Sequence, residues 1–259
     1  MESKTYAVFL DLDGTLMTHN QIPSANITAI AAVRRRGHKV FLNTGRSLAC
    51  IPGHVIDGLE LDGIIAGIGS HIMYQDNVLL STVMPLPLLR LLETRFEQQA
   101  YPCVFEGEQI MLYTRLKAAE GIRFVHYLDG ENTLTGTYRQ ERITKATVFT
   151  VMTEEDQAYL STIFNVYQHE TYAEIAMKGC TKAGGMQRML DHLALDKTNC
   201  IAMGDSANDH DMLAAAGISV AMGNATAKTK EICDLVTAEA GKAGVALALE
   251  QLLPSAFSR

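Results

Sequence analysis

Short apolar runs alternate with helical patterns at both ends of this 259-residue chain, and this alternation restricts the fold more than any other feature. In the first part of the chain, strands are expected at residues 6–10, 39–42 and 64–68, followed by a hairpin of residues 72–74 and 78–80. Between the first two strands, apolar side chains recur at helical spacing, with Ser24 expected as the N-cap and Gly37 after the helix end. Strand, helix and strand at these distances predict right-handed crossovers and a parallel sheet.

The strand–helix alternation stops near residue 84 and returns near residue 181. In between, helices are expected at residues 85–99 and 117–127 and from Thr153 with Asp156 onward, and strands at 103–105, 109–113, 144–152 and 171–177. After residue 181, helices are expected at 182–193, 210–216, 227–233 and 245–252, and strands at 200–203 and 218–221. We therefore predict an α/β protein with a doubly wound, Rossmann-like parallel core, residues 1–83 and 181–259, into which residues 84–180 are inserted as an α+β domain.

The composition argues against several classes of protein. A formal net charge of −7 without a basic stripe argues against a nucleic-acid partner, and no apolar run approaches the roughly 18 residues of a membrane span. The first residues lead into a strand pattern without a signal-peptide h-region, so a cytoplasmic protein is expected. The five cysteines are scattered and form no CxxC pair, which predicts neither a disulfide framework nor a thiolate zinc site.

Two carboxylates directly follow the first expected strand. Asp11 and Asp13 stand at positions i and i+2, which on an extended chain places both side chains on one face. Carboxylates this close repel unless a cation or a shared proton lies between them, and Mg²⁺ fits such a pair better than zinc. Gly14 permits a sharp exit from the strand, and Thr15 adds a hydroxyl. Alone, the triplet also fits a solvated acidic loop.

Two further polar clusters follow expected strands. In one, Asp205 and Asp209 come after an apolar run, with Asn208 between them as a source of an amide oxygen. Asp205 can complete a metal site, although this cluster alone also fits a helix N-cap region. In the other, Thr44 and Gly45 offer a hydroxyl and backbone N–H groups suited to phosphate oxygens. Because open α/β sheets bind ligands at the carboxyl ends of their strands, these clusters are expected to form one site.

Together, the motifs resemble those of the haloacid dehalogenase superfamily, and within it the Cof-type phosphatases with a large, C2B-like cap between the second and third motifs. The similar segments are DLDGTL at 11–16, NTGR at 43–46, Lys182 in GCTKAGG, GDSANDHDML at 204–213, AMGNA at 221–225 and AGVALAL at 243–249. Two places depart from the usual family pattern. Ala183 stands where a glycine follows the motif lysine, which leaves Lys178 as a competitor, and residues 69–71 replace the usual Asn-Gly-Ala.

This resemblance implies a Mg²⁺-dependent phosphatase that hydrolyses a small phosphorylated metabolite, such as a sugar phosphate, a nucleotide or a cofactor phosphate. Asp11 would be the nucleophile that forms an aspartyl-phosphate, and Asp13 the general acid and base. The resemblance also implies phosphate contacts from Thr44, Gly45 and Lys182, a metal held by Asp11, Asp205 and the carbonyl of Asp13, and supporting roles for Asn208 and Asp209. Arg46 is a candidate substrate contact, with a surface salt bridge as an equal alternative.

The inserted domain is then expected to close over the site and to select the leaving group. The protein itself is expected to be a monomer or a small homo-oligomer. Two other functions stay open at this point. A sugar phosphomutase would use the same aspartyl-phosphate, and a non-catalytic phosphate-binding regulatory module would bind phosphate without turnover.

Overall fold

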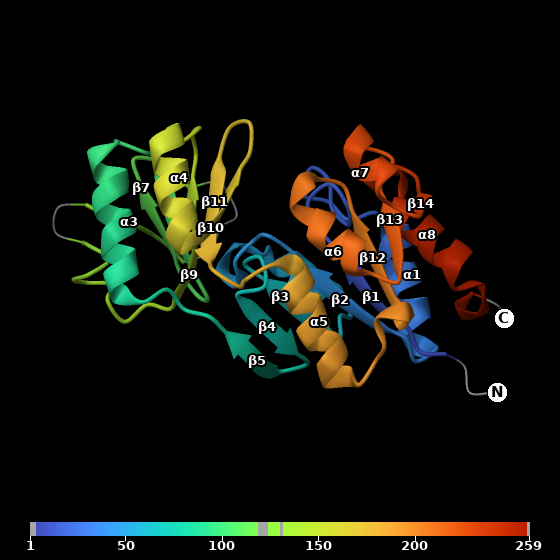
Figure 1. Cartoon of the computed structure of the whole chain (residues 1–259). Helices are drawn as coiled ribbons and strands as arrows, with labels where there is room; N and C mark the ends of the chain where they lie inside the picture. Colours follow the sequence, from blue (N-terminus) through green and yellow to red (C-terminus); the bar gives the residue numbers. More distant parts are fainter. Residues whose placement is uncertain (1–3, 119–123, 130–131, 258–259) are drawn as a thin grey trace. The chain divides into compact units, whose positions relative to one another are not determined.

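The computed structural model describes residues 4–118, 124–129 and 132–257 and divides the chain into two compact units (Figure 1). The first unit consists of Met1–Gly45, Gly53–Leu79 and Thr181–Arg259, and the second of Arg46–Pro52 and Leu80–Cys180. The segments 46–52 and 80–83, which the sequence pattern assigns to the core, thus belong to the second unit. Each unit has its own sheet and its own helices.

The core sheet has eight described strands in the order β14-β13-β12-β1-β2-β3-β4-β5, of which β5 begins in the first unit and ends in the second. They are β1 (Ala7–Leu10), β2 (Lys39–Asn43), β3 (Gly63–Ala66), β4 (His71–Tyr74), β5 (Asn77–Ser81), β12 (Cys200–Gly204), β13 (Ile218–Ala221) and β14 (Leu235–Val236). Neighbours from β14 to β3 are parallel, and β4 returns antiparallel to β3. The strand order reverses at β1, whose Leu10 is in register with Leu42 of β2 and Met203 of β12.

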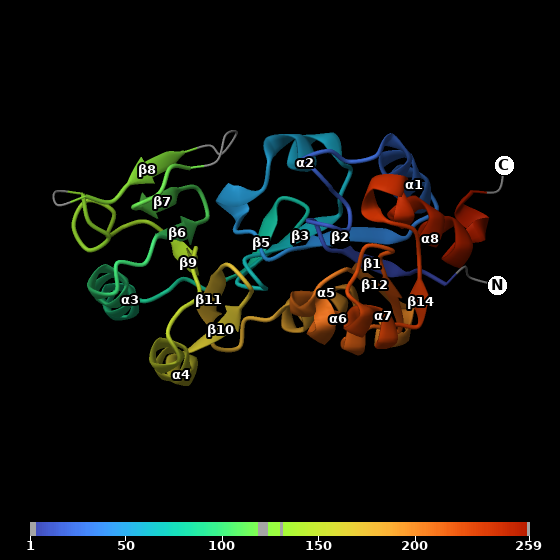
Figure 2. The same cartoon turned by 90° about the horizontal axis from the view of Figure 1, so that it is seen from above.

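Helices cover both faces of this sheet (Figure 2). They are α1 (Ser24–Arg35), α2 (Gly53–Gly58), α5 (Lys182–Leu193), α6 (His210–Ala215), α7 (Ala227–Glu231) and α8 (Gly244–Leu252). In Figure 2, α1, α2 and α8 lie on one face, and α5, α6 and α7 lie on the other. Because both faces are covered, β1, with the sequence AVFL, is buried along its whole length. The doubly wound α/β core predicted from the sequence is therefore confirmed.

The predicted ends of α1 and the start of α5 can be compared with the structure. Gly37 follows α1 with a φ of +89°, a left-handed conformation that glycine adopts without a Cβ penalty. The prediction that Ser24 caps this helix is wrong, because Ser24 is its first helical residue and Pro23, which offers no side-chain hydrogen bond, occupies the cap position. In α5, the hydroxyl of Thr181 accepts a backbone hydrogen bond from the first turn, so the helix begins at Lys182 as predicted.

The second unit is a two-layer α+β structure. Its six described strands have the order β10-β11-β9-β6-β7-β8 and comprise β6 (Cys103–Gly107), β7 (Met111–Thr114), β8 (Val125–Tyr127), β9 (Ile143–Val148), β10 (Phe164–Gln168) and β11 (Ala173–Met177). The pairs are antiparallel except for the parallel pair β7–β8. Helices α3 (Leu86–Gln98) and α4 (Glu154–Ile163) lie on one face of the sheet (Figure 2), where Phe96 and Leu160 pack into a core with Phe105.

Three segments of the second unit differ from the sequence-based expectation. The helix expected at 117–127 is wrong over Val125–Tyr127, which forms β8 by pairing with β7, and residues 119–123 lie outside the described residues. The strand expected at 144–152 ends at Val148. Strand β10 was not expected, because it follows α4 directly without a turn residue between them. Strand pairing over long distances overrides local propensity in these places.

Candidate active site

Asp11 follows β1 at the carboxyl edge of the core sheet. Its backbone N–H donates to the carbonyl of Met203 in β12 at 3.1 Å, so the neighbouring strand fixes its position. The residue is only 5% exposed. Because the strand order reverses at β1, Asp11 lies in the crevice where open α/β sheets bind ligands.

The chain turns immediately after Asp11. The N–H of Gly14 donates to the carbonyl of Met17 at 2.9 Å, and Gly14 itself has a φ of +80°. A Cβ at this position would lie 2.5 Å from Asp205 Oδ2, so only glycine lets the loop approach that carboxylate so closely. The expectation that the chain stays extended through Asp13 is therefore wrong, since Asp13 is exposed in the turn whereas Asp11 is buried.

Lys182 joins two of the expected carboxylates. Its Nζ lies 2.6 Å from Asp11 Oδ1 and 2.5 Å from Asp209 Oδ1, and its side chain is completely buried. Burial disfavours the ammonium, but the two carboxylates outweigh this effect and raise the pKa of Lys182. Lys178, the competing lysine, is exposed and belongs to the second unit. The contact with Asp11 is thus made by the lysine that matches the motif.

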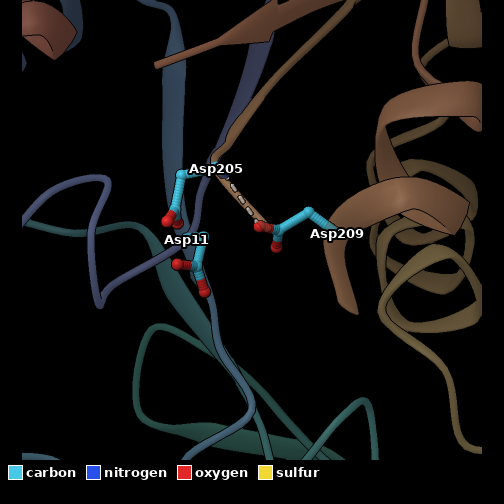
Figure 3. A group of neighbouring side chains, drawn as sticks. All are labelled: Asp11, Asp205 and Asp209. Atoms are coloured by element: carbon cyan, nitrogen blue, oxygen red, sulfur yellow. Dashed lines mark hydrogen bonds between the residues drawn. The ribbon is translucent and has the colours of Figure 1, made fainter. Parts of the chain in front are cut away.

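Asp209 holds both Lys182 and the loop that follows β12. Its Oδ1 contacts Lys182, and its Oδ2 accepts hydrogen bonds from the backbone N–H groups of Asp205 at 3.0 Å and Ser206 at 3.1 Å (Figure 3 shows the first of these). A Cβ on Gly204 would lie 2.6 Å from Asp209, which explains the glycine at the strand end. Both oxygens of Asp209 are therefore engaged by the protein itself.

Figure 3 shows three carboxylates converging at this edge of the sheet. One oxygen each of Asp11, Asp205 and Asp209 lies within 4.8 Å of the others. Burial, followed by the charge of Asp209, raises the pKa of Asp205 to about 6. Burial also raises the pKa of Asp11 well above its ordinary value, although Lys182 opposes the rise. A single ammonium does not balance three carboxylates, so the cluster has an excess of negative charge.

The donor atoms fit a hard divalent cation. Among the described contacts, Lys182 engages Oδ1 of Asp11, and the hydroxyl of Thr15 donates to Oδ1 of Asp205 at 3.1 Å. No contact between described residues engages Oδ2 of either carboxylate, so both oxygens are accessible as ligands. Carboxylate oxygens are the ligands that Mg²⁺ and similar ions prefer, and a divalent charge offsets the excess described above.

Thr44 and Gly45 lie buried at the end of the adjacent strand β2. The N–H of Thr44 donates to Ile65 O in β3 at 2.9 Å, and its carbonyl accepts from Ile68 N in the following loop at 3.2 Å, so β3 and that loop together hold this residue. Arg46 belongs to the second unit, where its Nη1 donates to Cys50 O at 3.1 Å. The contacts that build the site thus join Asp11, Lys182, Asp205 and Asp209, and Thr44 and Gly45 directly follow the adjacent strand β2.

The segment at 69–71, where the sequence departs from the family pattern, packs close to Lys182. Gly67, Ile68 and Gly69 all have positive φ values, of 58°, 58° and 83°. A Cβ on Gly69 would lie 2.3 Å from the carbonyl oxygen of Thr181, the residue before Lys182. The departure thus places a glycine where the loop closely approaches the start of α5.

The sequence did not indicate the hydrogen-bond partners of several side chains that support the site. Besides Thr15, these include Asn43, whose Nδ2 donates to Lys182 O at 3.0 Å, and Ser206, whose hydroxyl donates to Asn208 Oδ1 at 2.7 Å. Ser206 and Asp209 form a capping box around the short turn Ala207–Asp209. The Ser-x-x-Asp spacing resembles that of a capping box and is the signal that would have identified Ser206.

Comparisons with known proteins give a consistent result. A sequence model described as haloacid dehalogenase-like hydrolase matches residues 8–249. The chain is 29% identical to the putative phosphatase YkrA of Bacillus subtilis and 28% identical to the 5-amino-6-(5-phospho-D-ribitylamino)uracil phosphatase YitU of the same species, in each case over 97% of this chain and 98% of the relative. A solved haloacid dehalogenase subclass IIB sugar phosphatase is 25% identical with a TM-score of 0.82, over 95% of this chain and 98% of that one.

The chain therefore belongs to the haloacid dehalogenase-like hydrolases, which confirms the family predicted from the motifs. The relatives and the solved structures support a hydrolase of the phosphatase class. The other departure from the family pattern, Ala183, lies in the first turn of α5, where its N–H donates to Asp211 Oδ2 at 3.1 Å. It does not disturb the contacts of the neighbouring Lys182.

Proposed function

We propose that this protein is a Mg²⁺-dependent phosphatase that hydrolyses a small phosphorylated metabolite through an aspartyl-phosphate on Asp11. The observation that carries the proposal is the buried contact of Asp11 with Lys182, next to Asp205, at the point where the strand order reverses. Relatives named as a phosphatase of a phosphoribitylamino-uracil and as a sugar phosphatase support substrates of this size.

The metal would be held by Asp11, Asp205 and the backbone carbonyl of Asp13. Asp209 lies in the same carboxylate cluster, but we assign it a supporting role because Lys182 and two backbone N–H groups already engage its oxygens. Asn208 would support the same loop. When bound, Mg²⁺ offsets the negative charge on the phosphoryl group during transfer.

Two displacements at phosphorus complete the reaction. In the first, a carboxylate oxygen of Asp11 attacks the phosphorus, the bond to the leaving oxygen breaks, and Asp13 gives that oxygen a proton. In the second, water attacks the phosphorus of the aspartyl-phosphate, the bond to Asp11 breaks, and Asp13 takes a proton from the water. The exposure of Asp13 supports this role, because its carboxyl can exchange protons with substrate and solvent.

The remaining site residues would bind the substrate. Thr44, the N–H of Gly45 and Lys182 would hold the phosphoryl oxygens, so that charge developing there meets fixed donors. Arg46 is a candidate contact to the rest of the substrate. We assign the catalytic role to the first unit and selection of the leaving group to the second, whose predicted range is 84–180.

A screen of the purified protein against phosphorylated metabolites tests the proposal, with inorganic phosphate measured in Mg²⁺ and in EDTA. We expect Mg²⁺-dependent phosphate release that Asp11→Asn abolishes and Asp191→Asn, at an exposed position of α5, leaves unchanged. Equal activity of Asp11→Asn and the parent would refute the mechanism. Product analysis distinguishes the alternatives: an isomerised sugar phosphate without phosphate release indicates a phosphomutase, and binding without turnover indicates a regulatory module.

Oligomeric state and location stay predictions of the sequence. None of the described helices is long and apolar enough to cross a membrane. The expectations of a monomer or small homo-oligomer, of a cytoplasmic location and of no nucleic-acid partner can be tested by light scattering, cell fractionation and a gel-shift assay.

A further inference from the structure

Asn224 connects two distant parts of the first unit. It follows β13 in the segment AMGNA, and it is exposed. Its Nδ2 donates to the carbonyl of Gly14 at 2.8 Å, and its Oδ1 accepts from the N–H of Ala240, also at 2.8 Å. The amide group is therefore anchored on one side and presents its NH₂ to the turn after Asp11 on the other.

The two segments that Asn224 connects both form hydrogen bonds with Asp205. Thr15, which follows Gly14, donates its hydroxyl to Asp205 Oδ1 at 3.1 Å. From the second segment, the N–H of Thr226, two residues after Asn224, donates to the backbone carbonyl of Asp205 at 3.3 Å. The side chain of Asp205 is thus bonded to the turn that Asn224 contacts, and its backbone is bonded to the segment that carries Asn224.

The segment that carries Asn224 is itself closely packed. Met222 N donates to Gly204 O at 3.0 Å, and Gly223 N donates to Ala238 O at 3.0 Å. A Cβ on Gly223 would lie 2.7 Å from the backbone nitrogen of Glu239, so the chain fits there only as glycine. Asn224 therefore projects from a closely held backbone, and its hydrogen bond adds an external contact to the Gly14 carbonyl, beside the bonds within the turn itself.

We infer that Asn224 is a positioning residue for Mg²⁺ binding. It fixes the peptide group between Gly14 and Thr15, which places the Thr15 hydroxyl on Asp205 and so orients the carboxylate toward Asp11. Without this bond, the turn after Asp11 moves away from Asp205, and the two carboxylates no longer face the same point. The inference rests on the proposed function, because it concerns the metal of that site.

The test compares Mg²⁺ binding by the full chain and two variants, measured by titration calorimetry and by the rise in melting temperature with Mg²⁺. Asn224→Ala removes the bond to Gly14, and because Asn224 is exposed the variant should fold. Lys230→Met is the matched control, since Lys230 Nζ donates to Gly223 O at 2.6 Å in the same segment without touching the turn. We expect a dissociation constant for Mg²⁺ about tenfold higher in Asn224→Ala and unchanged within about twofold in Lys230→Met.

The outcomes separate this inference from the proposed function. Equal Mg²⁺ affinity of Asn224→Ala and the parent, or an equal loss in both variants, would overturn the positioning role while Mg²⁺-dependent phosphate release by the parent leaves the proposed function intact. No binding of Mg²⁺ by the parent would overturn both. The calorimetric readout needs no substrate, so it stands even before the metabolite is identified.

Discussion

Lys182 Nζ lies 2.6 Å from Asp11 Oδ1, although the two residues are 171 positions apart in the chain. The same ammonium lies 2.5 Å from Asp209 Oδ1. One buried cation therefore compensates two buried carboxylates, of which one is the proposed nucleophile. Because a buried charge without its partner is costly, this shared contact links the stability of the core to its chemistry.

Replacing Lys182 should affect both properties. We expect Lys182→Met to lower the free energy of unfolding by about 3–5 kcal/mol at neutral pH, because two buried carboxylates lose their partner. Phosphate release should fall by about 10²–10³-fold through loss of a donor to the phosphoryl group. Urea unfolding and a phosphate assay measure the two effects. Lys178→Met, at the exposed alternative lysine, serves as the control and should change neither; the reverse pattern would show that the wrong lysine was assigned.

Gly14→Ala should displace Asp205. The new Cβ would lie 2.5 Å from Asp205 Oδ2, and the residue would also have to keep a φ of +80°. Gly37→Ala separates these effects, since Gly37 has a φ of +89° with nothing within 4 Å of the added Cβ. Both variants should lose about 1–2 kcal/mol of stability from the left-handed backbone. Weaker Mg²⁺ binding is expected for Gly14→Ala alone; equal Mg²⁺ affinity in the two variants would contradict the contact with Asp205.

Asp205 should make the metal-free protein less stable as the pH rises. Its pKa is raised from 3.8 to about 6, first by burial, so the folded state binds a proton that the unfolded state has lost between these pH values. The contribution of Asp205 to the free energy of unfolding, about 2–3 kcal/mol, is fully present below about pH 4 and is lost as the pH rises through 6. Urea unfolding in EDTA at pH 4 and pH 7 measures this effect. The free energy of unfolding should fall less between these two pH values in Asp205→Asn than in the parent.

Mg²⁺ should reverse this dependence. A bound cation favours the charged carboxylate, so the rise in melting temperature with Mg²⁺ should be larger at pH 7.5 than at pH 5. A thermal-shift titration at both values measures it. A larger rise at pH 5 would mean that Asp205 is not among the ligands.

Glu174 in the second unit should show the opposite pH dependence. Lys145 Nζ lies 2.5 Å from its Oε1 within the sheet. Burial raises the pKa of Glu174, but the charge of Lys145 and the contact with His169 outweigh it and lower the pKa to about 2 from 4.5. The charge of Glu174 therefore contributes about 3 kcal/mol to the free energy of unfolding above pH 4.5, and this contribution is lost as the pH falls toward 2.

Two glutamate variants test this prediction. Glu174→Gln should reduce the protection of the second-unit amides from hydrogen exchange at pH 6. The deficit should shrink toward pH 3, because below pH 4.5 the unfolded parent binds a proton that the folded parent does not, which lowers the stability gained from the charge. Glu170→Gln, at an exposed position, should match the parent at both values. A deficit in Glu174→Gln that does not depend on pH would point to packing rather than charge.

Local sequence was sufficient for the elements that place the site. The apolar run before Asp11 became β1, because a strand covered on both faces must be apolar throughout. The helix predicted at 182–193 begins at Lys182 as expected; the hydroxyl of Thr181, which was not predicted as a cap, accepts the backbone N–H three residues later. The order of the motifs also indicated the family that the comparisons show.

Other features depended on contacts between distant residues. The turn that exposes Asp13 follows from the close approach of Gly14 to Asp205, and the sharing of Lys182 between Asp11 and Asp209 requires three elements to meet. Strand β8 replaced an expected helix because β7 offers it backbone partners. The sequence by itself determined which residues stand at strand ends; the tertiary structure decided which of them touch, because those contacts form only when the strands of the sheet are aligned.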